Sequence, residues 1–192
     1  MILNISDWPA DLSPLVLADL ISLAPELRVR YPDVTANPRL DPQAEQQRLY
    51  ESAFIFFARL ASEAPLMLML EDMHWADGGT IALARSLARR FHQTKTKVLM
   101  LLTFREVELT EQKGLSDLLN NWHREHLASA IKLHRLDAQG TQNMLEALFA
   151  ESVTADFADR VYRETEGNPF FIEEICKALI DGGQVYRENG QW

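Results

Sequence analysis

Two almost wholly apolar runs, each followed at once by charged residues, are the most regular feature of the hydrophobic pattern. Leu66–Leu70 is followed by Glu71 and Asp72, and Val98–Phe104 is followed by Arg105. Short apolar runs without alternation are typical of strands that helices cover on both faces. The pattern therefore predicts two buried, central strands.

Apolar residues at helical spacing surround these runs. A long helix is predicted to begin at Asp41–Pro42, which suit a cap and a first turn, and to end at Pro65. Further helices are predicted over 80–91 and 114–122, and alternation over 130–136 predicts a third strand. Strands that alternate with helices imply a parallel α/β sheet, whose strand ends and ligand share one edge.

After Leu136 the pattern changes to helices alone. Three are predicted, each with residues suited to its start: 137–149 with Asp137, 154–167 with Thr154, and 168–181 with Asn168 and Pro169. Asn189–Gly190 is a hairpin turn signal. The pattern thus divides the chain into a Pro-rich irregular connection (1–42), an α/β core (43–136), a helical part (137–183) and the start of a hairpin (184–192).

Composition narrows the class of protein. The 192 residues carry a formal charge of −9, with a sequence pI near 5.0, which argues against broad nucleic-acid binding. The one cysteine, Cys176, excludes an intramolecular disulfide framework and fits a reducing, cytoplasmic location. No apolar stretch approaches the roughly 20 residues of a membrane span, so we expect no membrane association.

The acid pair that follows the first predicted strand is the leading chemical candidate. Carboxylates resist desolvation, so two of them at the exit of a buried strand need a reason. In P-loop nucleotidases one such acid holds Mg²⁺ and its neighbour orients or deprotonates the attacking water. The alternative is structural: acids at a strand end often cap the next helix. Similarly, Trp75 is interpreted as a core anchor for that helix and Asp77 as its cap.

Three ordered motifs carry a resemblance to a known family. The first strand with its acids and His74–Asp77 resembles the Walker B region of signal-transduction (STAND) ATPases, found in LuxR-type transcriptional regulators and in some nucleotidyl cyclases. Leu101–Arg105 resembles the next strand of that family, and Gly167–Glu174 its helical-lid motif. Gly190–Trp192 resembles the start of the winged-helix hairpin that follows. The similarity covers about residues 43–192.

The resemblance implies a fold, a set of site residues and their ligands. The implied fold is a partial parallel P-loop NTPase-like α/β sheet, then an all-helical lid and the start of a winged helix. Glu71 matches the Mg²⁺ position, where many relatives have Asp, and Asp72 matches the catalytic acid and a second Mg²⁺ ligand. Arg105 matches the phosphate sensor, and Pro169 with Asn168 the adenine contact.

The function implied is that of an ATP-binding regulatory switch domain in a multidomain signalling or transcriptional regulator. Its cofactors would be ATP and Mg²⁺, with slow ATP hydrolysis in the longer protein. Its partners would be ATP and the other domains of the same polypeptide, with self-association possible and no direct contact of this segment with nucleic acid.

A phosphate-binding loop is missing from the sequence. Such a loop needs glycines and a Gly-Lys pair, and none of the eight glycines is followed by lysine. We therefore expect an internal fragment of a longer protein, with weak or no ATP hydrolysis of its own. Loss of the loop in a degenerate homologue is the competing account.

The sequence is also compatible with two other functions. One is a nucleotide-free protein-interaction module that retains the NTPase fold. The other is a metallohydrolase that uses metal-ligand residue types near the first strand, although no HExxH motif supports it. Its candidate ligands are Glu71, Asp72, His74, Asp77 and His92.

Overall fold

The computed structural model describes residues 11–183, which are mostly helical and contain one two-stranded parallel sheet. The chain divides into two compact units, Met1–Ser129 and Ala130–Trp192. In the first unit the elements are α1 (Pro14–Leu23), η2 (Pro25–Val29), α2 (Pro42–Glu63), β1 (Leu66–Leu70), η3 (Met73–Trp75), α3 (Gly78–Thr94), β2 (Val98–Leu102), η4 (Glu106–Glu108) and α4 (Lys113–Arg124), where η denotes a 3₁₀ helix. The second unit contains α5 (Ala138–Phe149), α6 (Ala155–Thr165) and α7 (Pro169–Asp181).

The expected P-loop NTPase-like sheet is wrong for this chain. The described residues form a small helix-rich fold in which only β1 and β2 pair. The third strand predicted at 130–136 is irregular, and Ile131 and Leu133 are 83% and 89% exposed. Alternation alone does not make a strand, because a strand also needs a neighbour for its backbone N–H and C=O groups.

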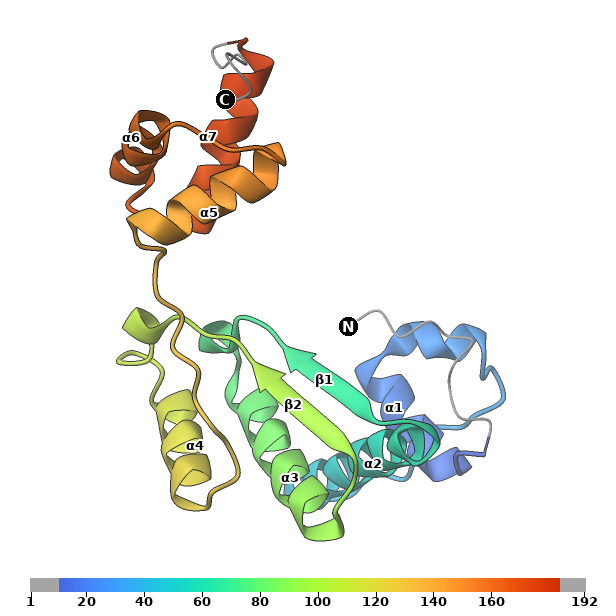
Figure 1. Ribbon diagram of the computed structural model, residues 1–192. Coiled ribbons are helices and arrows are strands. Elements are labelled where there is room, and N and C mark those ends of the chain that lie inside the picture. The colour runs from blue at the N-terminus through green and yellow to red at the C-terminus, as the bar shows by residue number, and fades with distance from the viewer. Residues whose placement is uncertain (1–10, 184–192) are drawn as a thin grey trace. The chain divides into compact units, whose positions relative to one another are not determined.

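The parallel sheet has one covered face. β1 and β2 pair in register from Leu66 opposite Val98 to Leu70 opposite Leu102. α2 and α3 lie along one side of the sheet (Figure 1), where Leu68 packs in a cluster with Phe54, Leu87 and Phe91. The other side carries exposed apolar side chains, so the expectation of helices on both faces is wrong among the described residues.

A second cluster joins the end of β1 to α3 and α4. Leu115 and Leu118 of α4 are fully buried against Met73 and Ile81. Burial of side chains of this size stabilises the fold by roughly 1.5–3 kcal/mol each. This packing holds the start of α3 and the residues between β1 and α3 against α4.

The Pro-rich N-terminal region contains α1 at Pro14–Leu23, where the apolar residues between its prolines predict a short amphipathic helix. α1 packs on α2 through Leu20, Ile21 and Phe56. The buried Asp19 carboxylate of α1 accepts hydrogen bonds from Arg48 Nε at 3.1 Å and Ser52 Oγ at 2.8 Å, both on α2. Prolines here begin helices at the first turn, where their missing N–H is not needed.

In the second unit, each of the three helices begins directly after the capping residue predicted from the sequence. The helix-start side chains accept hydrogen bonds from the backbone of their own helices: Asp137 from Gly140, Thr154 from Phe157 and Asn168 from Phe170. A shared core forms from Leu145, Val161, Ile172 and Cys176.

The predicted hairpin at 184–192 lies outside the described residues. Within 11–183, no helix has the length and apolarity needed to cross a bilayer.

A close backbone approach precedes α5 and α7. Leu136 N donates to Gly167 O at 2.8 Å, and Gly167 has a left-handed φ of +72°. A Cβ at Gly167 would lie 1.8 Å from the Leu136 carbonyl oxygen. Glycine is therefore required here for both its conformation and its size.

The first prediction concerns this glycine. Gly167→Ala should lower the free energy of unfolding of the second unit by at least about 2 kcal/mol, because the backbone of Leu136 must move. Gly78→Ala is the matched control, since nothing lies within 4 Å of its added Cβ. Thermal unfolding of both variants tests this, and equal melting temperatures would contradict the close approach.

Candidate functional site

Backbone hydrogen bonds continue the strand pairing beyond the sheet. Thr103 N donates to Leu70 O at 3.0 Å, and Met73 N donates to Thr103 O at 2.9 Å. The two segments after β1 and β2 therefore stay side by side as they leave the sheet. Because the strands are parallel, both segments leave at the same edge.

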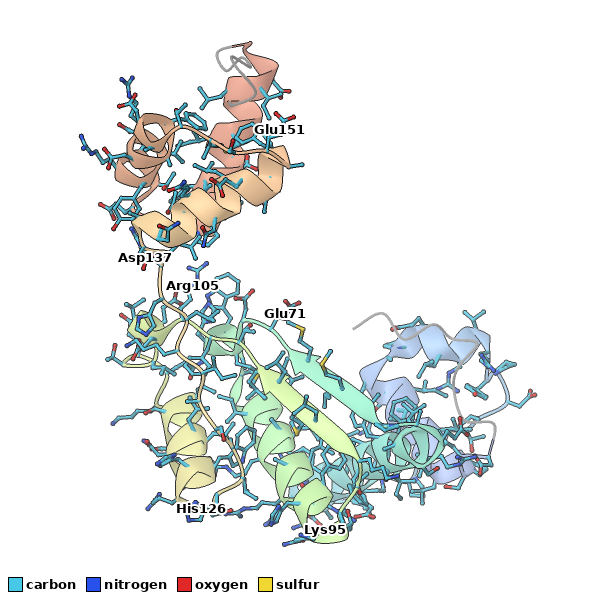
Figure 2. The ribbon with its side chains drawn as sticks, in the orientation of Figure 1. Glu71, Lys95, Arg105, His126, Asp137 and Glu151 are labelled. Atoms are coloured by element: carbon cyan, nitrogen blue, oxygen red, sulfur yellow. The ribbon has the colours of Figure 1, made fainter. Side chains whose placement is uncertain are left out.

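This edge brings the leading candidates together. Glu71 and Asp72 follow β1, Arg105 follows β2, and Figure 2 shows Glu71 and Arg105 at the same end of the sheet. Glu71 is exposed, and the side chains of Asp72 and Arg105 are 56% and 62% exposed. All three charged groups are thus open to a ligand from solvent.

Asp72 has an unusual backbone conformation. Its φ and ψ are 53° and 41°, in the left-handed region that costs free energy for residues other than glycine. Its N–H donates to Thr103 Oγ1 at 3.1 Å, which ties this conformation to the end of β2. Among the described residues Glu166 is also a left-handed acid, but it is the C-cap of α6, where this conformation is common. Asp72 instead follows a strand, and backbone outliers of that kind are concentrated at functional sites.

The side chain of His74 is fully buried near Asp72 and Glu108. Its Nδ1 accepts a hydrogen bond from Arg105 N at 3.4 Å. Nε2 lies 3.6 Å from Glu108 Oε2 and 3.9 Å from Asp72 Oδ1, and it has no hydrogen-bond partner among the described residues. The histidine therefore has a buried nitrogen near two carboxylates, neither of which is close enough for a hydrogen bond.

Arg105 is held by two neighbours. Its NH1 lies 3.2 Å from Glu108 Oε1, and its guanidinium lies 5.6 Å from the centre of the Trp75 ring. Trp75 is 68% exposed, so its interpretation as a core anchor is wrong. The short 3₁₀ helix η3 turns Met73 and His74 inward instead, and Trp75 faces outward.

Two contributors to this edge are not among the candidates drawn from sequence, namely Glu108 and Thr103. Glu108 stands three residues after Arg105, a spacing at which side chains meet on a helical turn. That spacing would have been enough to predict a contact between Glu108 and Arg105. No sequence signal pointed to the Thr103 hydroxyl, because its partner is the backbone amide of Asp72, 31 positions earlier in the sequence.

Asp77 is the cap of α3, as predicted. Its Oδ1 accepts a hydrogen bond from Thr80 N at 2.6 Å. This hydrogen bond, with further ones from the Thr80 side chain and Gly79 N–H, holds the pKa of the Asp77 carboxyl below its usual value. Its role is therefore explained by the helix start alone.

The candidate adenine contacts belong to the second unit. Asn168 Oδ1 accepts a hydrogen bond from Phe170 N at 3.1 Å, and Pro169 is the exposed first residue of α7. Both residue types are explained by helix capping and by the N1 preference of proline. Their assignment to adenine depends on the resemblance.

The described residues do not support a metallohydrolase. Within 11–183, no group of three or more His, Cys, Asp or Glu side chains is arranged to hold a metal ion. Glu71 and Asp72 together offer at most two carboxylates. Cys176 is not a reactive thiol either, because it is buried in the second unit and burial raises its pKa.

Comparisons with known proteins add one distant relative. No family model matches the chain, and no solved structure matches it significantly. Over 140 residues the chain is 26% identical to an uncharacterized protein of Rhizobium meliloti (strain 1021), an alignment that covers 71% of this chain and 12% of that protein. The chain thus spans only a small part of the relative's length.

The second prediction tests the backbone of Asp72. Because residue 72 is left-handed, Asp72→Gly should be about 1 kcal/mol more stable than Asp72→Ala. Urea unfolding of the two variants measures the difference. Equal stabilities would show that residue 72 does not hold a left-handed conformation in solution.

The third prediction concerns pH and the cap of α3. The pKa of Asp77 is lowered in the folded state, so its stabilising contribution is complete above its unfolded pKa, near 4, and is lost as the pH falls through the lower folded value. Asp77→Asn retains a capping side chain that does not titrate. The stability advantage of the unmodified chain over Asp77→Asn should therefore shrink between about pH 6 and pH 2.5.

Thermal unfolding across that pH range gives the measurement. A difference between the two proteins that stays constant with pH would contradict the assigned hydrogen bonds to the ionised carboxylate.

Proposed function

We propose that this chain is part of an ATP-binding regulatory switch in a multidomain signalling or transcriptional regulator. The observation that carries the proposal is the meeting of Glu71, Asp72 and Arg105 at one edge, after two paired parallel strands. The order of the three sequence motifs supports the same function. The proposed partners are ATP, further domains of the same polypeptide and a second copy of the protein.

The residues at this edge fit part of a Mg-ATP site. Mg²⁺ is commonly held by one or two carboxylates, with water and phosphate oxygens as its other ligands. The exposed Glu71 and Asp72 side chains suit that coordination, and the exposed Arg105 guanidinium suits a phosphate. When bound, Mg²⁺ would supply charge neutralisation at the phosphates.

The same residues do not provide a cradle for a triphosphate. The sequence contains no Gly-Lys pair, so neither the glycine loop nor its lysine is present. The two-stranded, helix-rich fold is not itself evidence for ATP binding. The proposal therefore rests on the side chains at the strand ends and on the order of the sequence motifs. We therefore assign ATP binding and slow hydrolysis to a longer polypeptide and not to these 192 residues.

A second candidate function is a nucleotide-free protein-interaction module. The specific observation in its favour is the exposed apolar side of the sheet, which includes Met67 and Leu99. Such a module would not respond to ATP. The two functions therefore differ in a directly measurable property.

The fourth prediction tests nucleotide binding in the natural polypeptide that carries this sequence. Arg105→Ala should weaken Mg-ATP binding about tenfold or more, since a charge-assisted contact to phosphate is worth roughly 1.5–3 kcal/mol. Asp72→Asn should reduce turnover with a smaller effect on affinity. Arg89→Ala is the matched control, because Arg89 pairs with Glu125 on the surface, away from this edge.

Isothermal titration and a phosphate-release assay provide the two readouts. The 192-residue chain alone should show little or no turnover, because it lacks most of the groups that stabilise phosphoryl transfer. Unchanged affinity and turnover in the Asp72→Asn/Arg105→Ala double variant would overturn the proposed mechanism. Absence of any ATP response in the natural polypeptide would favour the interaction module.

A further inference from the structure

The uncovered side of the sheet, which we call the outer face, consists of four apolar side chains. Met67 and Met69 of β1 are 60% and 42% exposed, and Leu99 and Leu101 of β2 are 63% and 39% exposed. The register places Met67 opposite Leu99 and Met69 opposite Leu101. The four side chains therefore form one continuous patch, on the side of the sheet away from α2 and α3 (Figure 1).

The composition of the outer face is unusual for a surface. A sheet with one solvated face alternates apolar and polar residues along each strand, whereas a parallel sheet covered on both faces is apolar throughout. β1 and β2 contain no polar residue at any of their ten positions, LMLML and VLMLL. The strands thus have the composition of a sheet that carries a second apolar layer.

The size of the patch indicates what kind of partner can cover it. Four side chains with these exposures offer on the order of 400 Å², less than the roughly 600 Å² per partner of small specific interfaces. A separate molecule would also lose translational and rotational freedom on binding. A segment of the same polypeptide avoids most of that cost, because its effective concentration is high.

We propose that the outer face is the docking surface for an apolar helix supplied by another part of the same, longer polypeptide. The distant relative supports a long polypeptide, since the aligned stretch is only 12% of that protein. A helix is the element that packs on the faces of parallel sheets, and two methionines give the face an adaptable shape. The inference does not depend on nucleotide binding, because the outer face is separate from the strand-end edge.

The experiment uses methionine oxidation as a probe of exposure. The 192-residue chain and the natural polypeptide isolated from its source are treated with dilute hydrogen peroxide, and sulfoxide formation is followed by mass spectrometry. Met73, which is 2% exposed, is the internal control in both proteins. In the 192-residue chain, Met67 and Met69 should oxidise at least tenfold faster than Met73, and in the natural polypeptide both should slow at least fivefold.

A pair of variants links protection to the outer face. In the natural polypeptide, Leu99→Gln should restore fast oxidation of Met67, while the melting temperature of the 192-residue chain changes little. Leu68→Gln is the matched control on the covered face, and it should destabilise the 192-residue chain itself because Leu68 is 4% exposed.

Three outcomes would overturn the proposal. Equal oxidation rates in the two proteins would show that no other segment covers the face. Protection in the 192-residue chain that grows with protein concentration would assign the face to a second copy. Protection that is independent of concentration would show that residues 1–192 cover the face themselves. None of these outcomes bears on ATP binding, so the two proposals fail separately.

Discussion

The parallel pairing of β1 with β2 is the constraint on which the rest of the first unit depends. Its register sends both strands out of the sheet at the same edge, and Thr103 continues the pairing with hydrogen bonds to the segment after β1. This pairing brings Glu71, Asp72 and Arg105 together, although more than 30 residues separate the acids from the arginine. Without it, those charges would be unrelated surface residues.

The same pairing creates two surfaces of different chemistry. At the strand-end edge, charged groups are exposed, and buried His74 accepts a hydrogen bond from Arg105 N while its Nε2 lies 3.9 Å from Asp72 and 3.6 Å from Glu108. On the outer face, the exposed side chains are apolar. The first surface offers charged groups and the second offers apolar ones, so the two proposals rest on separate sets of residues.

Local signals in the sequence were sufficient for most helices and for both strands. Asp41, Asp77 and Asn168 cap the helices that follow them, because a side-chain oxygen needs only the amides of its own first turn. The apolar runs predicted β1 and β2, and the charged residues that close them predicted the candidate site. The meeting of those residues at one edge also followed, since parallel strands end together.

Other features were decided by contacts between distant residues. α1 became part of the core because Asp19 and its apolar neighbours found partners on α2. The alternating segment 130–136 is not a strand, because no strand of the described residues pairs with it. After β1, the buried aromatic side chain is that of His74 and not that of Trp75. The sequence by itself determined the elements and the candidate charges, which depend on near neighbours. Only the tertiary structure decided which faces are covered, because burial depends on the segments available to pack against each face.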